Sequence, residues 1–484
     1  MSILKNSVSM IAGNFFNKIA SVIVLILVAG SLDSASFGRY SFAVSYLAFF
    51  AVFTDLGINT LITRDISSGV VHAPLAFGNA ILIRLCLSFL ALAMALSGLL
   101  VLSYGRETVM IVIASAPMLF FSFRGLFFRT VFDIPFQSRL KMAAPSLVNA
   151  LSECLTLAAA AWLVHIRAPL LWLVLGIALS YMPGFALAAF LSFRIITPEF
   201  RFDAARLKEL ILSALPLAGA VFFEGLFLIT PVFVLSRFST EAAMGLYSLP
   251  QRLVTSLWVV PVALMVTLLP GMSRGMVLAK AGLEKAVRAL LITGIPITLV
   301  TEAYSSELVF FFAGHEYAGS SAALSIMMLG TLAYFVNAAF FYGFVAAGLQ
   351  SANMLIWAVI SALSVLLSLA LIPGYHEAGA ALGFTLPLIS VIPLNIILAK
   401  RLLGISVFTV MAHFALSGAS AALVLFALPV AKGLSVAFSV AVYASMLFAL
   451  RAVDFSNGPS WFSALYRKLL KFLRKHLTDA NKKI

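Results

Sequence analysis

Charged residues and cysteines are scarce in this sequence. Only 10% of the 484 residues are Asp, Glu, Lys or Arg, where a soluble domain has about 25%, and 62% are apolar, with a mean hydropathy of +1.09. The two cysteines, Cys86 and Cys154, both fall inside apolar stretches, which excludes a disulfide framework and a cysteine-based metal site. This composition predicts an integral membrane protein.

Motifs for nucleotide hydrolysis and for metal catalysis are also missing from the sequence. It contains no G-x-x-x-x-G-K-[ST] segment and no H-E-x-x-H segment, and its histidines are scattered. We therefore expect no bound cofactor, no metal and no enzymatic activity. Any transport would draw its energy from an ion gradient, from a partner or from mass action.

Long apolar runs, by contrast, recur along the chain. Each approaches the ~20 residues that cross the hydrocarbon core of a bilayer. They predict an all-α polytopic membrane protein with about fourteen transmembrane helices. The runs cover residues 8–30, 40–63, 77–102, 108–128, 142–166, 170–193, 210–237, 244–269, 287–312, 322–347, 352–373, 378–399, 408–428 and 434–451.

The Lys and Arg residues between these runs are distributed unevenly. Most of the 32 fall on one side of the membrane, among them Arg124, near the end of the fourth run, and Arg129, directly after it. Because cytoplasmic loops are enriched in Lys and Arg, this side is predicted to be cytoplasmic, with both termini on it. The net charge of +14 is then mainly a topology signal.

The segment 453–484 combines apolar and basic residues at helical spacing. This pattern predicts a basic amphipathic tail that lies in the anionic lipid headgroups of the cytoplasmic side. An arm that binds nucleic acid is the alternative, and it is disfavoured because the apolar face would be wasted on phosphates. We expect membrane lipids, and no nucleic acid, as partners of this tail.

An internal repeat links the two halves of the chain. Shifting the sequence by 207 positions aligns residues 13–41 with 220–248 without a gap, and Gly38 then meets Gly245. The paired helices run in the same direction, which predicts two six-helix lobes related by a parallel pseudo-two-fold axis, plus two C-terminal helices. The predicted units are the first lobe at 1–193, a linker at 194–209, the second lobe at 210–400, helices 13 and 14 at 401–452, and the tail at 453–484.

Two cations inside the repeated helices are candidates for substrate binding. An ionisable group at mid-membrane costs ~2.5–3.5 kcal/mol and usually faces protein or water. Lys18 and Arg252 lie in the first and eighth runs, where a cation could neutralise a phosphate group; extension of each side chain to the nearer membrane interface is the alternative. Their neighbours Asn17 and Gln251 could donate to sugar hydroxyls, with packing between helices as the alternative.

Four other charged residues are candidates for ion coupling or gating. Asp55 and Arg84 lie at similar depth on neighbouring helices, and a structural ion pair is the simpler interpretation. Glu153 and Glu224 lie near the middle of the fifth and seventh runs, where desolvation would favour a protonated carboxyl. Each could couple a proton, or could be a neutral acid hydrogen-bonded across helices; the second interpretation is favoured for Glu153.

At this point the sequence resembles a known family. The stretch 37–40 (Phe-Gly-Arg-Tyr), followed by Asp55-Leu56-Gly57 and Arg64, is similar to the G-x-Y, D-x-G and R pattern of polysaccharide-export flippases. These belong to the multidrug/oligosaccharidyl-lipid/polysaccharide exporter superfamily. The second half agrees at 245–248, 269–273, 312–314 and 373–381, so the resemblance covers about residues 8 to 400.

The resemblance implies transport of a polyprenyl-pyrophosphate-linked oligosaccharide from the cytoplasmic to the outer leaflet of a bacterial plasma membrane. Such lipids feed the synthesis of O-antigen, capsule or exopolysaccharide, so a polysaccharide polymerase and glycosyltransferases are implied partners of a monomeric transporter. The family places cations of the first and eighth helices in a central cavity, which matches Lys18 and Arg252. The alternatives are a cation-coupled multidrug exporter of the same superfamily and, less favoured, a membrane enzyme of polysaccharide assembly.

Overall fold

The computed structural model describes residues 2–69, 71–139, 141–201, 204–273, 275–427 and 432–450. Every regular element in these ranges is a helix, which confirms the all-α fold class. The described residues include 12 helical stretches that are long and apolar enough to cross a membrane. The predicted tail at 453–484 lies outside the described residues.

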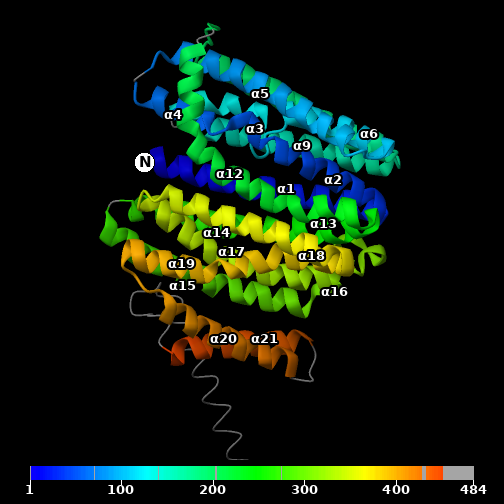
Figure 1. Ribbon diagram of the computed structural model, residues 1–484, viewed down its shortest axis with the longest axis vertical. Helices are drawn as coiled ribbons and strands as arrows, with labels where there is room; N and C mark the ends of the chain where they lie inside the picture. Colours follow the sequence, from blue (N-terminus) through cyan, green and yellow to red (C-terminus); the bar gives the residue numbers. More distant parts are fainter. Residues whose placement is uncertain are drawn as a thin grey trace, which may run out of the picture.

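The first lobe occupies the upper half of Figure 1 and contains α1 to α11. Its longest helices are packed side by side, with α1 against α9 and α2 against α5 and α6. The bounds are α1 Ser2–Ser31, α2 Ser34–Phe50, α3 Val52–Asp55, α4 Ile58–Ser67, α5 Ala73–Val101, α6 Arg106–Ser115, α7 Pro117–Phe121, η1 Phe128–Asp133, α8 Ile134–Ser138, α9 Ala143–His165, α10 Leu170–Leu179 and α11 Met182–Ile195.

The second lobe lies below the first in Figure 1, and α20 and α21 pack against its outer helix α15. Its core is made by α12, α17 and α18, with α18 in contact with both of the others. The bounds are α12 Ala204–Phe238, α13 Glu241–Ser256, α14 Val259–Met272, α15 Met276–Ala303, α16 Ser305–Ala313, η2 His315–Tyr317, α17 Ser320–Ala346, α18 Gln350–Ser390, α19 Ile392–Leu398, η3 Ala399–Leu403, α20 Phe408–Ala427 and α21 Lys432–Ala449.

The stretch from α18 to η3 forms a hairpin of two membrane-spanning helices. The stretch 350–403 has 54 residues, about 81 Å of straight helix, while the core of a bilayer is ~30 Å thick. His376 interrupts it with φ 46° and ψ −121°, and a methyl group on Gly383 would lie 3.4 Å from the Cα of Ser368. The chain therefore folds back on itself, as the separate predicted runs 352–373 and 378–399 require.

The fourth predicted run does not form one helix of spanning length. It divides into α6 and α7, after which the chain leaves helical geometry at Ser122 and turns through Gly125, where φ is +61°. With the hairpin counted as two crossings and this broken run as one, the described helices are compatible with the predicted fourteen. The break interrupts the end of the fourth predicted run, where Arg124 stands.

The repeat appears in the way the second helix of each lobe begins. The Asp33 carboxylate accepts from the Ser36 amide at 3.2 Å and caps α2, and the Thr240 hydroxyl accepts from the Ala243 amide at 3.1 Å and caps α13. These two cap positions are 207 residues apart. Hydrogen bonds from Ser36 also hold the pKa of Asp33 below its usual value. The same local chemistry therefore starts both helices.

The two capped helices cross at paired glycines. A methyl group on Gly38 would lie 2.9 Å from the Gly245 amide nitrogen, and one on Gly245 would lie 3.2 Å from the Ser34 Cα. Because Gly38 and Gly245 are repeat equivalents, each lobe presents the same surface to the other, as a two-fold axis requires. Only glycine allows the backbones of α2 and α13 to approach this closely.

Polar contacts between the lobes cluster at the same end of the molecule. The Tyr104 hydroxyl lies 2.6 Å from that of Ser236, and the Tyr317 hydroxyl donates to the Leu32 carbonyl at 3.1 Å. Arg39 lies between Glu107 of its own lobe and Glu241 of the other, 3.5 Å from the Glu241 carboxylate. The lobes are therefore joined at this end, which the distribution of Lys and Arg predicts to be the outer one.

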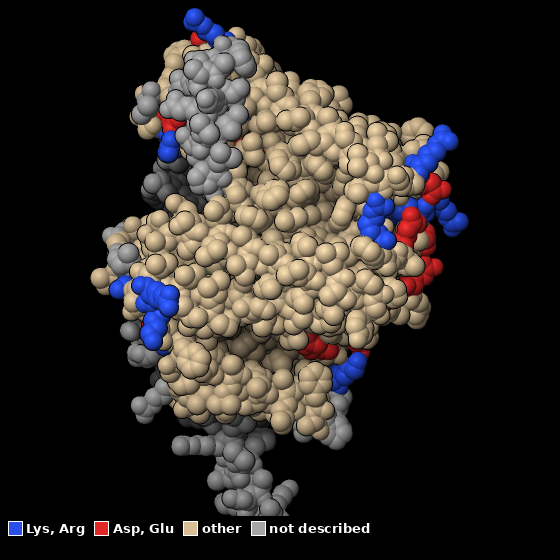
Figure 2. Space-filling model, viewed as in Figure 1, with Lys and Arg blue, Asp and Glu red and all other residues tan. Residues whose placement is uncertain are grey.

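On the face shown in Figure 2, exposed charged side chains lie at the two sides of the view. Figure 2 shows blue and red atoms at both sides of the view and a broad uncharged surface between them. Large apolar side chains such as Phe89, Trp162 and Leu366 are more than half exposed on the described helices. Such a surface is unfavourable in water and suits contact with lipid.

Candidate functional site: a cationic cavity between the lobes

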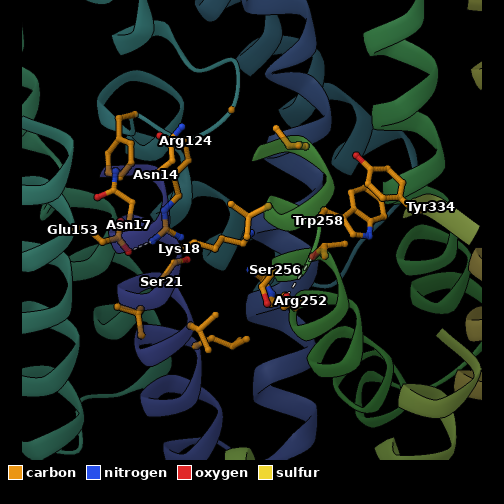
Figure 3. Close-up of a pocket in the computed structure, with 18 of the residues that line it drawn as sticks. Asn14, Asn17, Lys18, Ser21, Arg124, Glu153, Arg252, Ser256, Trp258 and Tyr334 are labelled. Carbon is orange, nitrogen blue, oxygen red and sulfur yellow. Dashed lines mark hydrogen bonds and ion pairs between the residues drawn. The ribbon is translucent and has the colours of Figure 1, made fainter. Parts of the chain in front are cut away.

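A cavity of about 560 Å³ lies between the two lobes. Figure 3 shows its polar side chains converging from both sides. The first lobe contributes residues of α1, α2 and α9 and the segment after α7, and the second lobe contributes α13, α14 and α17. The polar lining residues are Asn14, Asn17, Lys18, Ser21, Tyr40, Arg124, Glu153, Arg252, Thr255, Ser256, Trp258 and Tyr334.

Both cations predicted from the sequence face this cavity. Lys18 comes from α1 and Arg252 from α13, and the two interact electrostatically across the lobe boundary. The Arg252 guanidinium lies 5.4 Å from the centre of the Tyr40 ring, and its Nη2 is buried without a hydrogen-bond partner among the described residues. A buried guanidinium with an unused donor is suited to bind an oxyanion.

A third cation, Arg124, also lines the cavity. It was counted among the cytoplasmic cations and was not predicted as a binding residue. The helix break after α7 brings its guanidinium into an ion pair with Glu153 of α9 and to 5.7 Å from the centre of the Tyr181 ring. Arg129, which was counted in the same way, is fully buried 3.9 Å from Asp133.

Glu153 is paired with a cation rather than hydrogen-bonded as a lone acid. Its side chain is fully buried, one carboxylate oxygen contacts Arg124, and the other has no hydrogen-bond partner among the described residues. Lys18 also interacts electrostatically with Glu153. The cavity thus holds three cations and one carboxylate, and its formal charge is +2.

The two predicted amides behave differently. Asn17 lines the cavity, and its side-chain oxygen is buried without a hydrogen-bond partner among the described residues. Gln251 is not part of the lining, because its amide donates to the Leu228 carbonyl at 2.9 Å and joins α13 to α12. For Gln251 the structure therefore supports the packing alternative.

Asp55 and Arg84 form the ion pair that their depths suggested. The Arg84 Nη1 lies 3.6 Å from the Asp55 Oδ1, and the arginine is fully buried inside the first lobe. Neither residue is part of the cavity lining. The pair therefore acts on the cavity only through the elements it joins.

A smaller cavity of about 280 Å³ lies inside the second lobe, around Glu224. It is lined by Asn337, Asn353 and Asn395, and the side-chain oxygens of Asn353 and Asn395 are buried without a hydrogen-bond partner among the described residues. Tyr334 and Val262 line both this cavity and the central one. Glu224 is therefore separated from the cationic cavity by a wall one side chain thick.

The wall includes a tight aromatic pair. The Trp258 and Tyr334 rings stack with their centres 3.6 Å apart and nearly parallel, as Figure 3 shows. Flat stacking of this kind holds both rings in place at the boundary of the two cavities. Movement of Tyr334 would change the shape of both cavities at once.

The two lateral boundaries between the lobes are unlike each other. Between α2, α3 and α12, the rings of Phe49, Phe53 and Phe222 pack within 6.0 Å of one another. Between α1 and α13, an apolar pocket of about 440 Å³ adjoins the central cavity, and Val22 and Ser256 line both. One boundary is closed by aromatic packing, and the other continues into apolar space.

No metal centre is apparent in the described ranges. They contain no group of three or more His, Cys, Asp or Glu side chains that could hold a metal ion. The chemistry available at the central cavity is therefore electrostatic binding and hydrogen bonding by Lys18, Arg124, Arg252 and their neighbours.

A helical bundle of two repeated lobes around a basic chamber is the architecture of membrane transporters. The sequence comparison identifies the family: residues 3–276 match the model described as polysaccharide biosynthesis protein. The match spans more than half of the chain. This chain therefore belongs to that polysaccharide biosynthesis family and is a multi-pass membrane protein.

Solved structures show the same fold. The lipid II flippase MurJ in an inward closed conformation aligns with a TM-score of 0.74 at 13% identity, over 95% of this chain and 99% of that one. An inward-facing multidrug resistance MATE family transporter aligns at 0.64 and 11%, over 82% and 98%. The MATE transporter VcmN of Vibrio cholerae, in the bent form, aligns at 0.54 and 15%, over 83% and 98%. No curated protein sequence matches the chain.

Proposed function

We propose that this protein moves a polyprenyl-pyrophosphate-linked oligosaccharide from the cytoplasmic to the outer leaflet of a bacterial plasma membrane. The observation that carries the proposal is the cavity between the lobes, with its three cations and one carboxylate. A prenyl pyrophosphate ester carries about two negative charges at neutral pH, which matches the cavity charge of +2. Surface polysaccharide synthesis, of O-antigen, capsule or exopolysaccharide, is the process it would serve.

The cavity surroundings support separate places for the parts of such a lipid. Lys18, Arg124 and Arg252 would hold the pyrophosphate, and Asn17 would bond to the first sugars. The apolar pocket between α1 and α13 adjoins the cations and would let the prenyl chain reach the lipid. The aromatic contact between α2 and α12 supports exit on the α1 side rather than the opposite one.

Transport would proceed by alternating access. The contacts of α2 with α13 close the outer end, and the lobes would rock about this crossing to open it. Glu224, which lines the smaller cavity together with three asparagines and two tyrosines, is the proposed coupling residue for a proton or another cation. The cation-rich side of the chain, with both termini, would face the cytoplasm.

A polysaccharide polymerase and glycosyltransferases are the proposed functional partners, and a monomer the proposed state. A multidrug exporter of the same superfamily is the alternative. Organic cations are attracted by carboxylates, and the excess of Lys and Arg in the central cavity would repel them. Resistance to cationic drugs on overexpression would favour this alternative.

The proposal is tested in cells that lack the protein. A Lys18→Ala/Arg252→Ala variant is expected to insert at normal levels and to leave surface polysaccharide absent. Arg401→Ala, which removes an exposed cation at the end of η3, is the matched control and should restore polysaccharide fully. Normal surface polysaccharide with the double variant would show that Lys18 and Arg252 do not form the binding site.

A further inference from the structure

We propose that Arg84, on α5, is a positioning residue for the central cavity: it holds the break between α7 and η1 in the shape that carries Arg124 inward. The proposal rests on the proposed function, because that function makes the cavity the binding place of an anionic group. Arg84 does not line the cavity, so its effect would pass through the segment 122–127.

The segment 122–127 joins α7 to η1, and after the Ser122 amide its backbone leaves the helical hydrogen-bond pattern. Ser122 has the extended angles φ −72° and ψ 141°, and Gly125 has φ +61°, a conformation that glycine adopts readily. A backbone carbonyl that is shielded from water must find a donor within the protein. The Phe127 carbonyl accepts from the Thr130 amide at 3.1 Å and from the Thr130 hydroxyl at 2.9 Å, so the Leu126 carbonyl depends most on donors from other elements.

Arg84 supplies those donors. Its Nη2 donates to the Leu126 carbonyl at 2.6 Å and to the Phe127 carbonyl at 2.9 Å. Its Nη1 donates to the Thr130 hydroxyl at 2.9 Å, and its Nε to the Thr54 carbonyl at 3.1 Å. The guanidinium thus ties the end of α3 to the C-terminal part of the break and to η1.

The shape of the guanidinium explains why an arginine stands at this position. Its donors point in fixed directions within one plane, so four acceptors around it are held in one arrangement. A lysine would keep the charge and would reach fewer of them. The Thr54 hydroxyl also donates to the Leu126 carbonyl and supports the same point.

Arg124 lies two residues before this anchored carbonyl, with only Gly125 between. Its guanidinium contacts Glu153 and lies near the Tyr181 ring, inside the cavity lining. A shift of Leu126 would therefore displace Arg124 as well, because one residue separates the two along the chain. The position of Arg124 in the cavity therefore depends on the hydrogen bonds that Arg84 makes to the segment.

The hydrogen bonds, rather than the ion pair with Asp55, carry this role. The Arg84 to Asp55 distance is 3.6 Å, longer than each of the four hydrogen bonds. If the ion pair were the essential feature, neutralising Asp55 would be as harmful as removing Arg84. If the anchoring of the break is essential, the two changes have unequal effects.

The test measures how closely residues 124 and 153 approach in the full-length protein. In a Cys86→Ala/Cys154→Ala background, Arg124→Cys and Glu153→Cys are joined by a bifunctional methanethiosulfonate reagent of arginine-like length. Adding Arg84→Gln or Arg84→Lys should lower the crosslinking yield by more than half. Ser88→Ala, which removes a buried hydroxyl of α5 bonded only to its own helix, should leave the yield unchanged.

Two further variants keep the test decisive. Asp55→Asn should lower the yield less than Arg84→Gln, and an equal loss would overturn the proposal. Thr54→Val leaves Arg84 in place and should give a partial loss, so it decides the question should Arg84→Gln fail to fold. An unchanged yield in folded Arg84→Gln protein, or in Thr54→Val protein, would also overturn it.

Binding of farnesyl pyrophosphate separates this proposal from the proposed function. With Arg124 and Glu153 intact, Arg84→Gln should weaken binding of this probe about tenfold, because one charge-assisted contact is misplaced. Failure of the unaltered protein to bind the probe would count against the proposed function. The crosslinking yields would still decide the role of Arg84.

Discussion

Four charged side chains set the chemistry of the central cavity. Lys18, Arg124 and Arg252 approach from both lobes, and Glu153 neutralises one of them. Charges of one sign held together in a poorly hydrated space repel each other, and an anion that enters relieves the repulsion. The carboxylate therefore sets how tightly an anionic group is held.

The first prediction concerns this carboxylate. Glu153→Gln raises the formal cavity charge from +2 to +3 and should tighten binding of farnesyl pyrophosphate about tenfold, since a nearby unit charge is worth a few kcal/mol at most. Release should slow in proportion, so transport should become slower while binding improves. Isothermal titration of the purified protein measures the affinity.

Glu302→Gln is the matched control for this prediction. Glu302 is a carboxylic acid of α15 outside the cavity lining, and its neutralisation should leave binding unchanged. Weaker binding by Glu153→Gln would contradict the account, because it would mean that the carboxylate is needed to hold Arg124 rather than to moderate the cavity charge.

At the scale of single residues, the sequence was informative where a charge stood inside an apolar run. Lys18 and Arg252 could be found because burying a cation in a membrane is costly and needs a reason. Arg124 could not be identified as a cavity residue from the sequence, because its position depends on a helix break that apolar composition does not reveal. The small residues Ser122 and Gly125 on either side of it were the available signal.

The crossing of α2 and α13 joins the lobes at the end that is predicted to face outward. Its glycines allow backbone contact between the lobes, and Arg39 adds a contact with Glu241 beside it. A close contact of this kind is sensitive to a single added methyl group, because the opposing atoms are backbone and cannot move alone.

The second prediction uses this sensitivity. Gly38→Ala and Gly245→Ala should each separate α2 from α13 and open the cavity toward the outer side. A cysteine placed at Ser21 in the cavity lining should then react several times faster with a charged thiol reagent added outside.

Gly30→Ala provides the control for both glycines. A methyl group on Gly30 would meet nothing within 4 Å, although it also lies near the outer end. Its labelling rate should equal that of the unaltered protein. Equal rates in all three variants would mean that the crossing does not close the cavity.

At the scale of elements, the length of the apolar runs predicted where helices occur. It did not predict where a helix is interrupted. The runs 352–373 and 378–399 were separated at Pro373 and Gly374, and the structure interrupts the helix close by, at His376. The run 108–128 reads as one helix in the sequence, whereas in the structure the Leu126 carbonyl accepts hydrogen bonds from Arg84 and Thr54 on other elements. Tertiary contacts of this kind leave no periodic pattern in a sequence.

At the scale of the whole molecule, two cavities lie next to each other. Tyr334 and Val262 line both the cationic cavity and the cavity of Glu224, so a change of charge in one cavity would alter the electrostatic potential in the other. Coupling of ion movement to transport would use this adjacency.

The third prediction tests that coupling. Glu224→Gln should leave farnesyl pyrophosphate binding unchanged and should make transport in proteoliposomes insensitive to an imposed proton or sodium gradient. Glu302→Gln should keep the response of the unaltered protein. A full response to both gradients in Glu224→Gln would exclude this carboxyl as the coupling group.

The two-lobe plan could be predicted at this scale because the repeat at an offset of 207 residues reappears in caps and in the helix crossing. The difference between the two lateral boundaries of the lobes could not be predicted from the sequence. It depends on which side chains meet between α12 and α2 and between α1 and α13, and the alignment of the repeats treats these boundaries as equivalent.

Direct measurement of translocation in proteoliposomes is the most decisive test of the account. A fluorescent prenyl-pyrophosphate-linked sugar is placed in both leaflets, and a glycosidase added outside reports which molecules reach the outer leaflet. The account predicts rapid, complete digestion with the unaltered protein and with Arg401→Ala, and digestion limited to the outer leaflet with Lys18→Ala/Arg252→Ala. Complete digestion with the double variant, or limited digestion with the unaltered protein, would contradict it.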